Sequence, residues 1–172
     1  MAHVIQIHEM TTDAATGVDK TSGTIRFKDA ASTSSTTADA NNPLVVPAAL
    51  SNYSYVKKLR AFMQAAPDIN ISNLRWYTDG TNGFGTGISV VAKNLGTTFG
   101  THYKTLMESG TDLFSYTSAA PLDGDGTDAG PFVPEDEGTY IGDIIELQME
   151  VHHTATNGAL VAETLTFSFD AI

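Results

Sequence analysis

The sequence predicts an all-β protein: a single domain over residues 1–172, with a β-sandwich or jelly-roll fold and long loops rich in Gly, Asp and Ser. Apolar and polar residues alternate along several short segments, as they do in strands that bury one face and leave the other in water. Long polar segments separate these runs, and such connections suit the crossovers of a sandwich or jelly roll. With 41% hydrophobic and 17% charged residues, the chain can bury one core.

Two short strands are predicted near the N-terminus. Ile5 and Ile7 alternate with polar residues, which indicates a strand within residues 1–10. The same segment is a candidate for an arm that pairs with the sheet of a partner protein. Residues 24–28 predict the second strand, because their two apolar side chains share one face. The small and polar residues 30–42 predict a flexible loop, which can likewise order on a partner.

The middle of the chain continues the β pattern. Residues 51–66 fit either a helix or a strand, because their apolar residues suit both spacings. We favour a strand, since the segments on both sides alternate as strands do. Leu74 and Trp76 share one face of a further predicted strand, and Trp76 is expected to fill the core. The β-branched run at 88–91 predicts another strand.

The clearest alternation lies in the C-terminal part of the chain. Over residues 144–152 apolar side chains alternate with polar ones, which predicts one buried face and one wet face that holds Glu146 and Gln148. Leu, Phe and polar residues alternate again over 164–170, so the chain is expected to end within a sheet. The segment 121–140, rich in Asp, Gly and Pro, predicts a long loop.

The charge balance argues against nucleic acid and membranes as partners. The formal net charge of −11 gives a negative surface, which repels phosphate backbones and anionic lipid headgroups. Lys57, Lys58 and Arg60 are too few for a basic stripe and predict a solvated strand face. The first residues lack the pattern of a signal peptide, and no apolar stretch is long enough to cross a bilayer. Synthesis in the cytoplasm, without a membrane span, is therefore expected.

No spacing of residues predicts an active site, so we expect a protein that is not an enzyme, with no catalytic residues and no organic cofactor. The chain contains no cysteine, which removes thiolate nucleophiles and sulfur-based metal sites. The nearest approach to a nucleophile elbow, at 87–91, lacks the second glycine. His152 and His153 are adjacent on a predicted strand, so their side chains should point to opposite faces and not share an ion.

Three carboxylates predict a possible calcium site in the segment LDGDGTDAG. Asp123, Asp125 and Asp128 are separated by glycines, and Ca²⁺ binds carboxylate and carbonyl oxygens on a flexible backbone. The full EF-hand pattern is absent, because Pro134 stands where the bidentate Glu is required. Turns of Asp and Gly without a metal are common, and that alternative stays open.

Four stretches that frame most of the chain carry a resemblance to a known family. They are 24–30 (TIRFKDA), 41–60 (NNPLVVPAALSNYSYVKKLR), 71–87 (ISNLRWYTDGTNGFGTG) and 163–172 (ETLTFSFDAI). In pattern and order the chain resembles small virion structural proteins of tailed bacteriophages. The resemblance implies a β-sandwich or jelly-roll domain of the capsid decoration or cement type, which commonly stands as a trimer at local symmetry axes.

Two functions follow as hypotheses. The first is a non-catalytic decoration or cement protein, a homotrimer on the capsid surface that contacts the major capsid protein and bridges capsomers. It would be made in the cytoplasm of the bacterial host and would bind neither nucleic acid nor membrane. The second is a carbohydrate-binding module of a head fibre or tail, in which loop aromatics stack on sugars. Its candidates are Trp76, Tyr77, Phe84, Tyr103, Phe114 and Tyr116.

Overall fold

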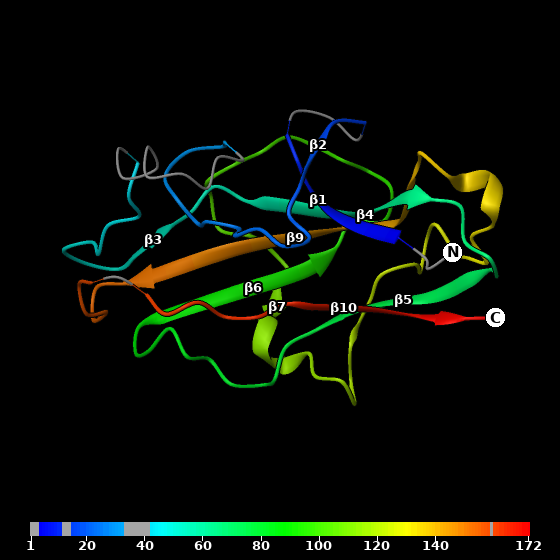
Figure 1. The fold of residues 1–172 in the computed structure, drawn as a ribbon. Coiled ribbons are helices and arrows are strands. Elements are labelled where there is room, and N and C mark those ends of the chain that lie inside the picture. Colours follow the sequence, from blue (N-terminus) through cyan, green and yellow to red (C-terminus); the bar gives the residue numbers. More distant parts are fainter. Residues whose placement is uncertain (1–3, 12–14, 33–41, 159) are drawn as a thin grey trace.

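The structure, a computed structural model, describes residues 4–11, 15–32, 42–158 and 160–172. Within these ranges the chain forms ten strands, which make two antiparallel sheets (Figure 1). The helical segments of these described residues are two single turns of 3-10 helix, η2 (Leu113–Ser115) and η3 (Pro134–Asp136). The all-β prediction is confirmed.

The larger sheet is built around one long central strand. It contains seven strands in the order β2-β1-β4-β9-β6-β7, and β3 pairs with the end of β9. The bounds are β1 (Val4–Met10), β2 (Gly17–Asp19), β3 (Ser51–Tyr53), β4 (Lys57–Ala65), β6 (Ile88–Asn94), β7 (Thr111–Asp112) and β9 (Tyr140–His152). Because β9 lies between β4 and β6, the backbone groups on both of its edges are paired within the sheet.

The smaller sheet has three strands and runs beneath the larger one (Figure 1). Its order is β10-β5-β8, with β5 (Ile71–Tyr77), β8 (Leu122–Asp123) and β10 (Thr166–Ala171). Apolar side chains of both sheets meet in one core cluster, in which Trp76 of β5 is 2% exposed. Its ring centroid lies 4.9 Å from that of Phe167 on β10. The β-sandwich is therefore confirmed, whereas the jelly-roll topology stays a prediction.

Most of the predicted strands are present. The ambiguous segment 51–66 contains β3 and β4, so the strand was the right choice over the helix. The predicted strands around Leu74 and at 88–91 are β5 and β6, and the alternation over 164–170 falls in β10. Leu74 is buried along with Trp76, as their shared face predicted.

The prediction of a strand at 24–28 is wrong. These residues lie in irregular backbone that belongs to neither sheet. The side chains of Ile25 and Phe27 nevertheless pack against the main core cluster. Alternation shows only that every second side chain is buried. An extended segment that pairs with no strand can bury its side chains in the same way.

The N-terminal strand is an integral part of the larger sheet. The strand predicted within residues 1–10 is β1, which pairs with β2 on one edge and β4 on the other. Glu9 and Met10 are buried. Since both edges of β1 are used, its position does not fit a free arm that pairs with a partner. The predicted flexible loop at 30–42 lies largely outside the described residues.

One prediction about β9 needs correction, because both of its faces are buried. Residues 141–149 are all buried, including Glu146 and Gln148, which were expected on a wet face. The segment 95–110, between β6 and β7, crosses the outer side of the larger sheet and covers this face (Figure 1). We call it the covering loop. Side chains that alternate in polarity are thus buried on one side by the core and on the other by a loop.

Candidate functional site

A buried ionic cluster lies on the covered face of the larger sheet. The strand register places Glu146 on β9 directly between Lys58 on β4 and Lys93 on β6. Lys58 Nζ lies 3.6 Å from Glu146 Oε1, and Lys93 Nζ lies 3.3 Å from Glu146 Oε2. Glu146 and Lys58 are each 1% exposed. One carboxylate therefore holds two cations from its neighbouring strands.

The ammonium group of Lys58 is enclosed by the covering loop. It donates hydrogen bonds to the carbonyl oxygens of Phe99 and Thr101, the latter over 2.9 Å. The ammonium also lies 4.5 Å from the centroid of the Phe99 ring, a cation–π arrangement. Burial lowers the pKa of Lys58, and the attraction of Glu146 opposes that shift. Its donors are directed at fixed oxygen atoms, so Lys58 acts here as a structural anchor.

Two further side chains fasten the covering loop to β9. The Tyr103 hydroxyl donates a hydrogen bond to Glu146 Oε2 over 2.7 Å. Gln148 donates to the carbonyl oxygens of Ser54 and Thr105 over 3.0 and 2.9 Å, and its Oε1 accepts from the Met107 backbone N–H over 2.7 Å. Every polar group of the Gln148 side chain is thus bonded, twice to the covering loop and once to Ser54 between β3 and β4, as buried amides require.

A pocket of about 300 Å³ opens beside this cluster, and Lys93, Tyr103 and Glu146 are among the residues that line it. Glu146 Oε1 is buried and accepts no hydrogen bond from the described residues. Its electrostatic partner is the Lys58 ammonium at 3.6 Å, which lies beyond hydrogen-bonding distance. The polar groups that line the pocket are therefore those of the ionic cluster beneath the covering loop.

Tyr103 provides a pH test of this arrangement. Burial raises the pKa of Tyr103 above its ordinary value of 10.0, and the hydrogen bond to Glu146 raises it further. Above pH 10 the folded state keeps a proton that the unfolded state loses, so this group makes the protein less stable as pH rises. We expect one tyrosine to remain un-ionised in an alkaline absorbance titration of the folded protein. In the Tyr103→Phe variant that late step should be missing, and its persistence would contradict the assignment.

The predicted solvated face of Lys57, Lys58 and Arg60 is wrong, because all three cations are paired. Lys57 Nζ lies 2.9 Å from Glu9 Oε1, and both residues are 2% exposed. Arg60 lies on β4 as well, and its guanidinium donates to Asp128 Oδ2 over 2.9 Å. The cations of β4 therefore meet carboxylates of β1, β9 and the 121–140 loop.

The structure brings two of the three predicted calcium ligands together. The Asp125 backbone N–H donates to Asp123 Oδ1 over 3.0 Å, and burial raises the pKa of the Asp125 carboxyl, with the neighbouring Asp123 adding to the shift. Asp128 instead pairs with Arg60. Within the described part of the chain, no group of three or more His, Asp or Glu side chains is placed to hold a metal ion. The calcium site remains a prediction.

Asp143 organises the same acidic loop and was missed by the sequence analysis. Its buried carboxylate accepts hydrogen bonds from the backbone N–H groups of Thr127 and Asp128 over 2.9 and 2.8 Å. It also accepts from Asn94 Nδ2 over 2.8 Å. Because this buried carboxylate accepts three hydrogen bonds, it fixes the position of the loop. Asp143 lies on β9 only three residues before Glu146, and nothing in the sequence distinguished it from the other acids.

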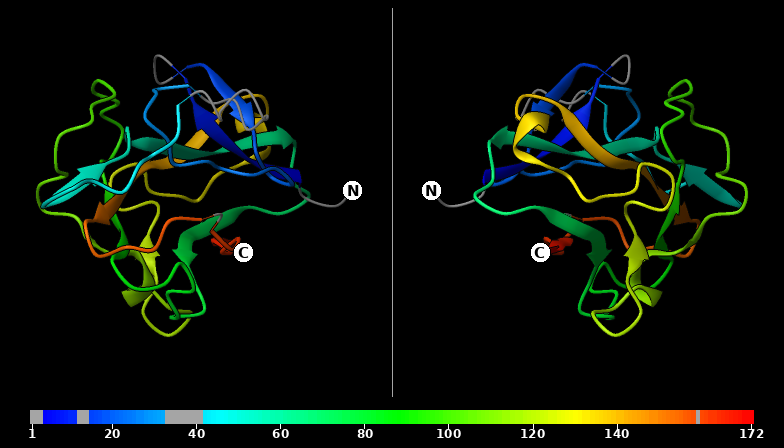
Figure 2. Two further views of the ribbon diagram at one scale, coloured as in Figure 1. Left: turned by 90° about the vertical axis from the view of Figure 1, so that its left-hand side faces the viewer. Right: turned by 90° about the vertical axis from the view of Figure 1, so that its right-hand side faces the viewer.

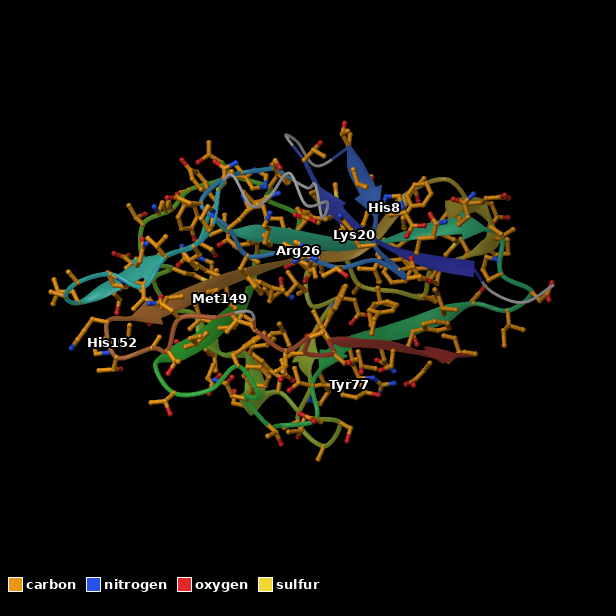
Figure 3. The ribbon with its side chains drawn as sticks, turned by 60° about the vertical axis from the view of Figure 1, so that its left-hand side comes forward. His8, Lys20, Arg26, Tyr77, Met149 and His152 are labelled. Carbon is orange, nitrogen blue, oxygen red and sulfur yellow. The ribbon has the colours of Figure 1, made fainter. Side chains whose placement is uncertain are left out.

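The predicted orientation of the histidine pair is also wrong. The rings of His152 and His153 lie 4.0 Å apart between centroids instead of on opposite faces. Strand β9 ends at His152 and a turn begins at His153, so the alternation of a strand no longer applies. Figure 3 shows His152 at this end of β9, whereas His8 lies over the middle of the sheet. His8 stacks on Phe62, with ring centroids 4.7 Å apart.

The aromatic side chains proposed for sugar stacking serve mainly internal contacts. Trp76 and Phe114 are buried in the core cluster, and Phe84 and Tyr116 pack against it. Tyr103 is bound to Glu146, as described above.

In the described residues no helix is long and apolar enough to span a membrane.

Comparison with known proteins gave no match. No protein-family model, no curated protein and no solved structure is similar to this chain at a significant level.

Proposed function

We propose that this chain is a non-catalytic structural protein of a tailed-bacteriophage particle, which decorates or cements the capsid. In this role a homotrimer, made in the host cytoplasm, contacts the major capsid protein on the capsid surface and bridges neighbouring capsomers. The family resemblance of the four sequence stretches supports the virion assignment. The sandwich fold supports a rigid body with loops at its ends for contacts. The distribution of charge carries the proposal furthest.

Most of the basic residues of this chain are either buried or paired with carboxylates. The chain has nine Lys and Arg residues against 20 Asp and Glu. Four of the nine are buried: Lys20, Lys28, Lys57 and Lys58. Four others pair with carboxylates: Arg60, Arg75, Lys93 and Lys104. Arg26 is exposed, but most acids of the described residues are at least partly exposed as well, so acidic side chains outnumber basic ones on the described surface.

Such a surface suits a subunit that is needed in many copies. Like-charged copies repel one another at long range, which limits nonspecific association before assembly. The same field repels DNA and draws the chain towards a cationic site on a partner protein. A trimer then forms through short-range contacts, and its symmetry lets three weak contacts with the capsid add up.

The proposal is tested by adding the purified chain to capsids that were assembled without it. We expect saturable binding that is detected by co-sedimentation, and capsids that withstand a higher temperature once the chain is bound. Capsids that neither bind the chain nor gain stability would contradict the proposal.

Binding is expected to depend strongly on salt. Raising NaCl from about 0.1 M to about 1 M shortens the Debye length from about 10 Å to about 3 Å. The association rate should then fall by about tenfold or more, because steering by the negative surface is screened. Surface plasmon resonance on immobilised capsids measures this rate. A rate that does not change with salt would show that the charge plays no part in docking.

A further inference from the structure

The chain contains two Asn–Gly pairs, and the structure places them in different surroundings. Asn82–Gly83 lies in the loop between β5 and β6, and Asn157–Gly158 lies in the segment that follows β9. An asparagine that precedes glycine can react with its own backbone, because the glycine has no side chain to shield the backbone nitrogen. Both pairs are exposed to water, so exposure alone does not distinguish them.

Asn82 is held by both polar atoms of its side-chain amide. Its Nδ2 donates to the carbonyl oxygen of Ile88 over 2.8 Å, and its Oδ1 accepts from the Phe84 backbone N–H over 3.0 Å. Gly83 is crowded as well, because a side chain at this position would collide with the Glu163 carboxylate. Turning the Asn82 amide towards the Gly83 nitrogen would break both hydrogen bonds, so this pair is held in an unreactive arrangement.

Asn157 has none of these restraints. No hydrogen bond joins its side-chain amide to the described residues. A Cβ built on Gly158 would have no heavy atom of the described residues within 4 Å outside its chain neighbours, and φ of Gly158 is +155°, a value that glycine adopts readily. The left view of Figure 2 faces this end of the sandwich, where the segment after β9 lies at the surface. The side chain and the backbone of this pair can therefore turn towards each other.

We propose that Asn157 is a site of spontaneous deamidation, at which the chain modifies itself without an enzyme. The Gly158 backbone nitrogen loses its proton and bonds to Cγ of Asn157. The bond from Cγ to Nδ2 breaks, and the side-chain nitrogen takes up a proton and leaves as ammonia. Water then opens the cyclic succinimide at either of its carbonyl carbons, which gives aspartate or isoaspartate. The net reaction consumes one water and needs no oxidant, reductant or cofactor.

Either product changes this end of the sandwich. A carboxylate replaces a neutral amide and adds one negative charge to the formal net charge of −11. Isoaspartate also routes the backbone through the former side chain, which lengthens the main chain by one carbon atom. Older copies of the chain should therefore be more acidic than newly made ones. The inference does not rest on the proposed capsid role, and its failure would leave that proposal untouched.

Timed incubation of the full-length folded chain in mildly alkaline buffer tests the inference, since the attacking nitrogen must lose its proton. Peptide mapping by mass spectrometry then follows the two asparagines separately in the same sample. We expect Asn157 to deamidate about 10- to 100-fold faster than Asn82, because two hydrogen bonds must first break at Asn82. The same chain unfolded in urea is the matched control. Neither pair is restrained there, so both should react at similar rates.

The inference is overturned if the folded chain deamidates at the two asparagines equally, or faster at Asn82. It is also overturned if both react in urea and neither reacts in the folded chain, because Asn157 would then be restrained as firmly as Asn82. The variant Asn157→Gln assigns the product, since the longer side chain closes the ring far more slowly. Ion-exchange chromatography should show an acidic form that accumulates in the wild type and not in this variant. Equal accumulation in both would place the reaction at another residue.

Discussion

Replacing Glu146 by glutamine is expected to lower the free energy of unfolding by about 3–5 kcal/mol, because two cations then lose their shared counter-ion in a buried site. Lys58 cannot reach water without displacing the loop that covers it. The shape of the side chain is nearly unchanged, so lost packing contributes little. Urea denaturation at pH 7 measures the effect.

The pH dependence of that variant gives a second, independent signature. Without Glu146 the pKa of Lys58 falls further below its ordinary value of 10.5, since burial then acts unopposed. Between that lowered pKa and 10.5, the unfolded state binds a proton that the folded state does not, so stability increases as pH rises. The deficit of Glu146→Gln relative to wild type should therefore shrink from about pH 7 towards about pH 10.

Two further variants separate the ion pair from other effects. Glu150→Gln alters a half-buried carboxylate on the same strand and should cost far less. Replacing both Lys58 and Glu146 by methionine should recover much of the loss, because neither charge is then left buried without a partner. If Glu146→Gln and Glu150→Gln lower the free energy of unfolding equally, the buried cluster contributes no more to stability than a half-buried carboxylate does.

Removing residues 1–10 is expected to prevent folding. The deletion takes β1 from between β2 and β4, along with the buried Met10 and the carboxylate of Glu9 that pairs with Lys57. A whole strand contributes more than the margin of about 5–15 kcal/mol that keeps a typical domain folded. Circular dichroism should show loss of the β spectrum and of a cooperative thermal transition.

The outcome of this deletion distinguishes a strand of the sheet from an arm. A free arm could be removed with loss of docking alone, and the remaining chain would keep its cooperative unfolding. The variant Gln6→Ala changes a partly buried polar residue of β1 without removing the strand and should fold normally. A deleted chain that folds like the wild type would contradict the position of β1 described above.

The sequence was informative where one face of a strand meets the core. Alternation located β5, β9 and β10, because side chains on a strand must point to opposite faces, and a β-branched run located β6. It could not locate partners, and residues 24–28 therefore alternate without belonging to a sheet. It also could not reveal the loop over β9. The wet face predicted for Glu146 and Gln148 became a second buried layer once that loop was in place.

The ionic cluster was accessible in principle from the sequence, but only through the register. Lys58 and Glu146 are 88 residues apart, and their pairing depends on how β4 aligns with β9. Opposite charges on two long strands were the one available signal.

The most direct test of the proposed role is the number of copies of this chain in purified particles of the phage that is proposed to encode it. Quantitative mass spectrometry gives this number relative to the major capsid protein. A decoration or cement subunit should be present at a stoichiometry close to that of the capsid protein. Its absence from purified particles, or its presence in only a few copies per particle, would contradict the account.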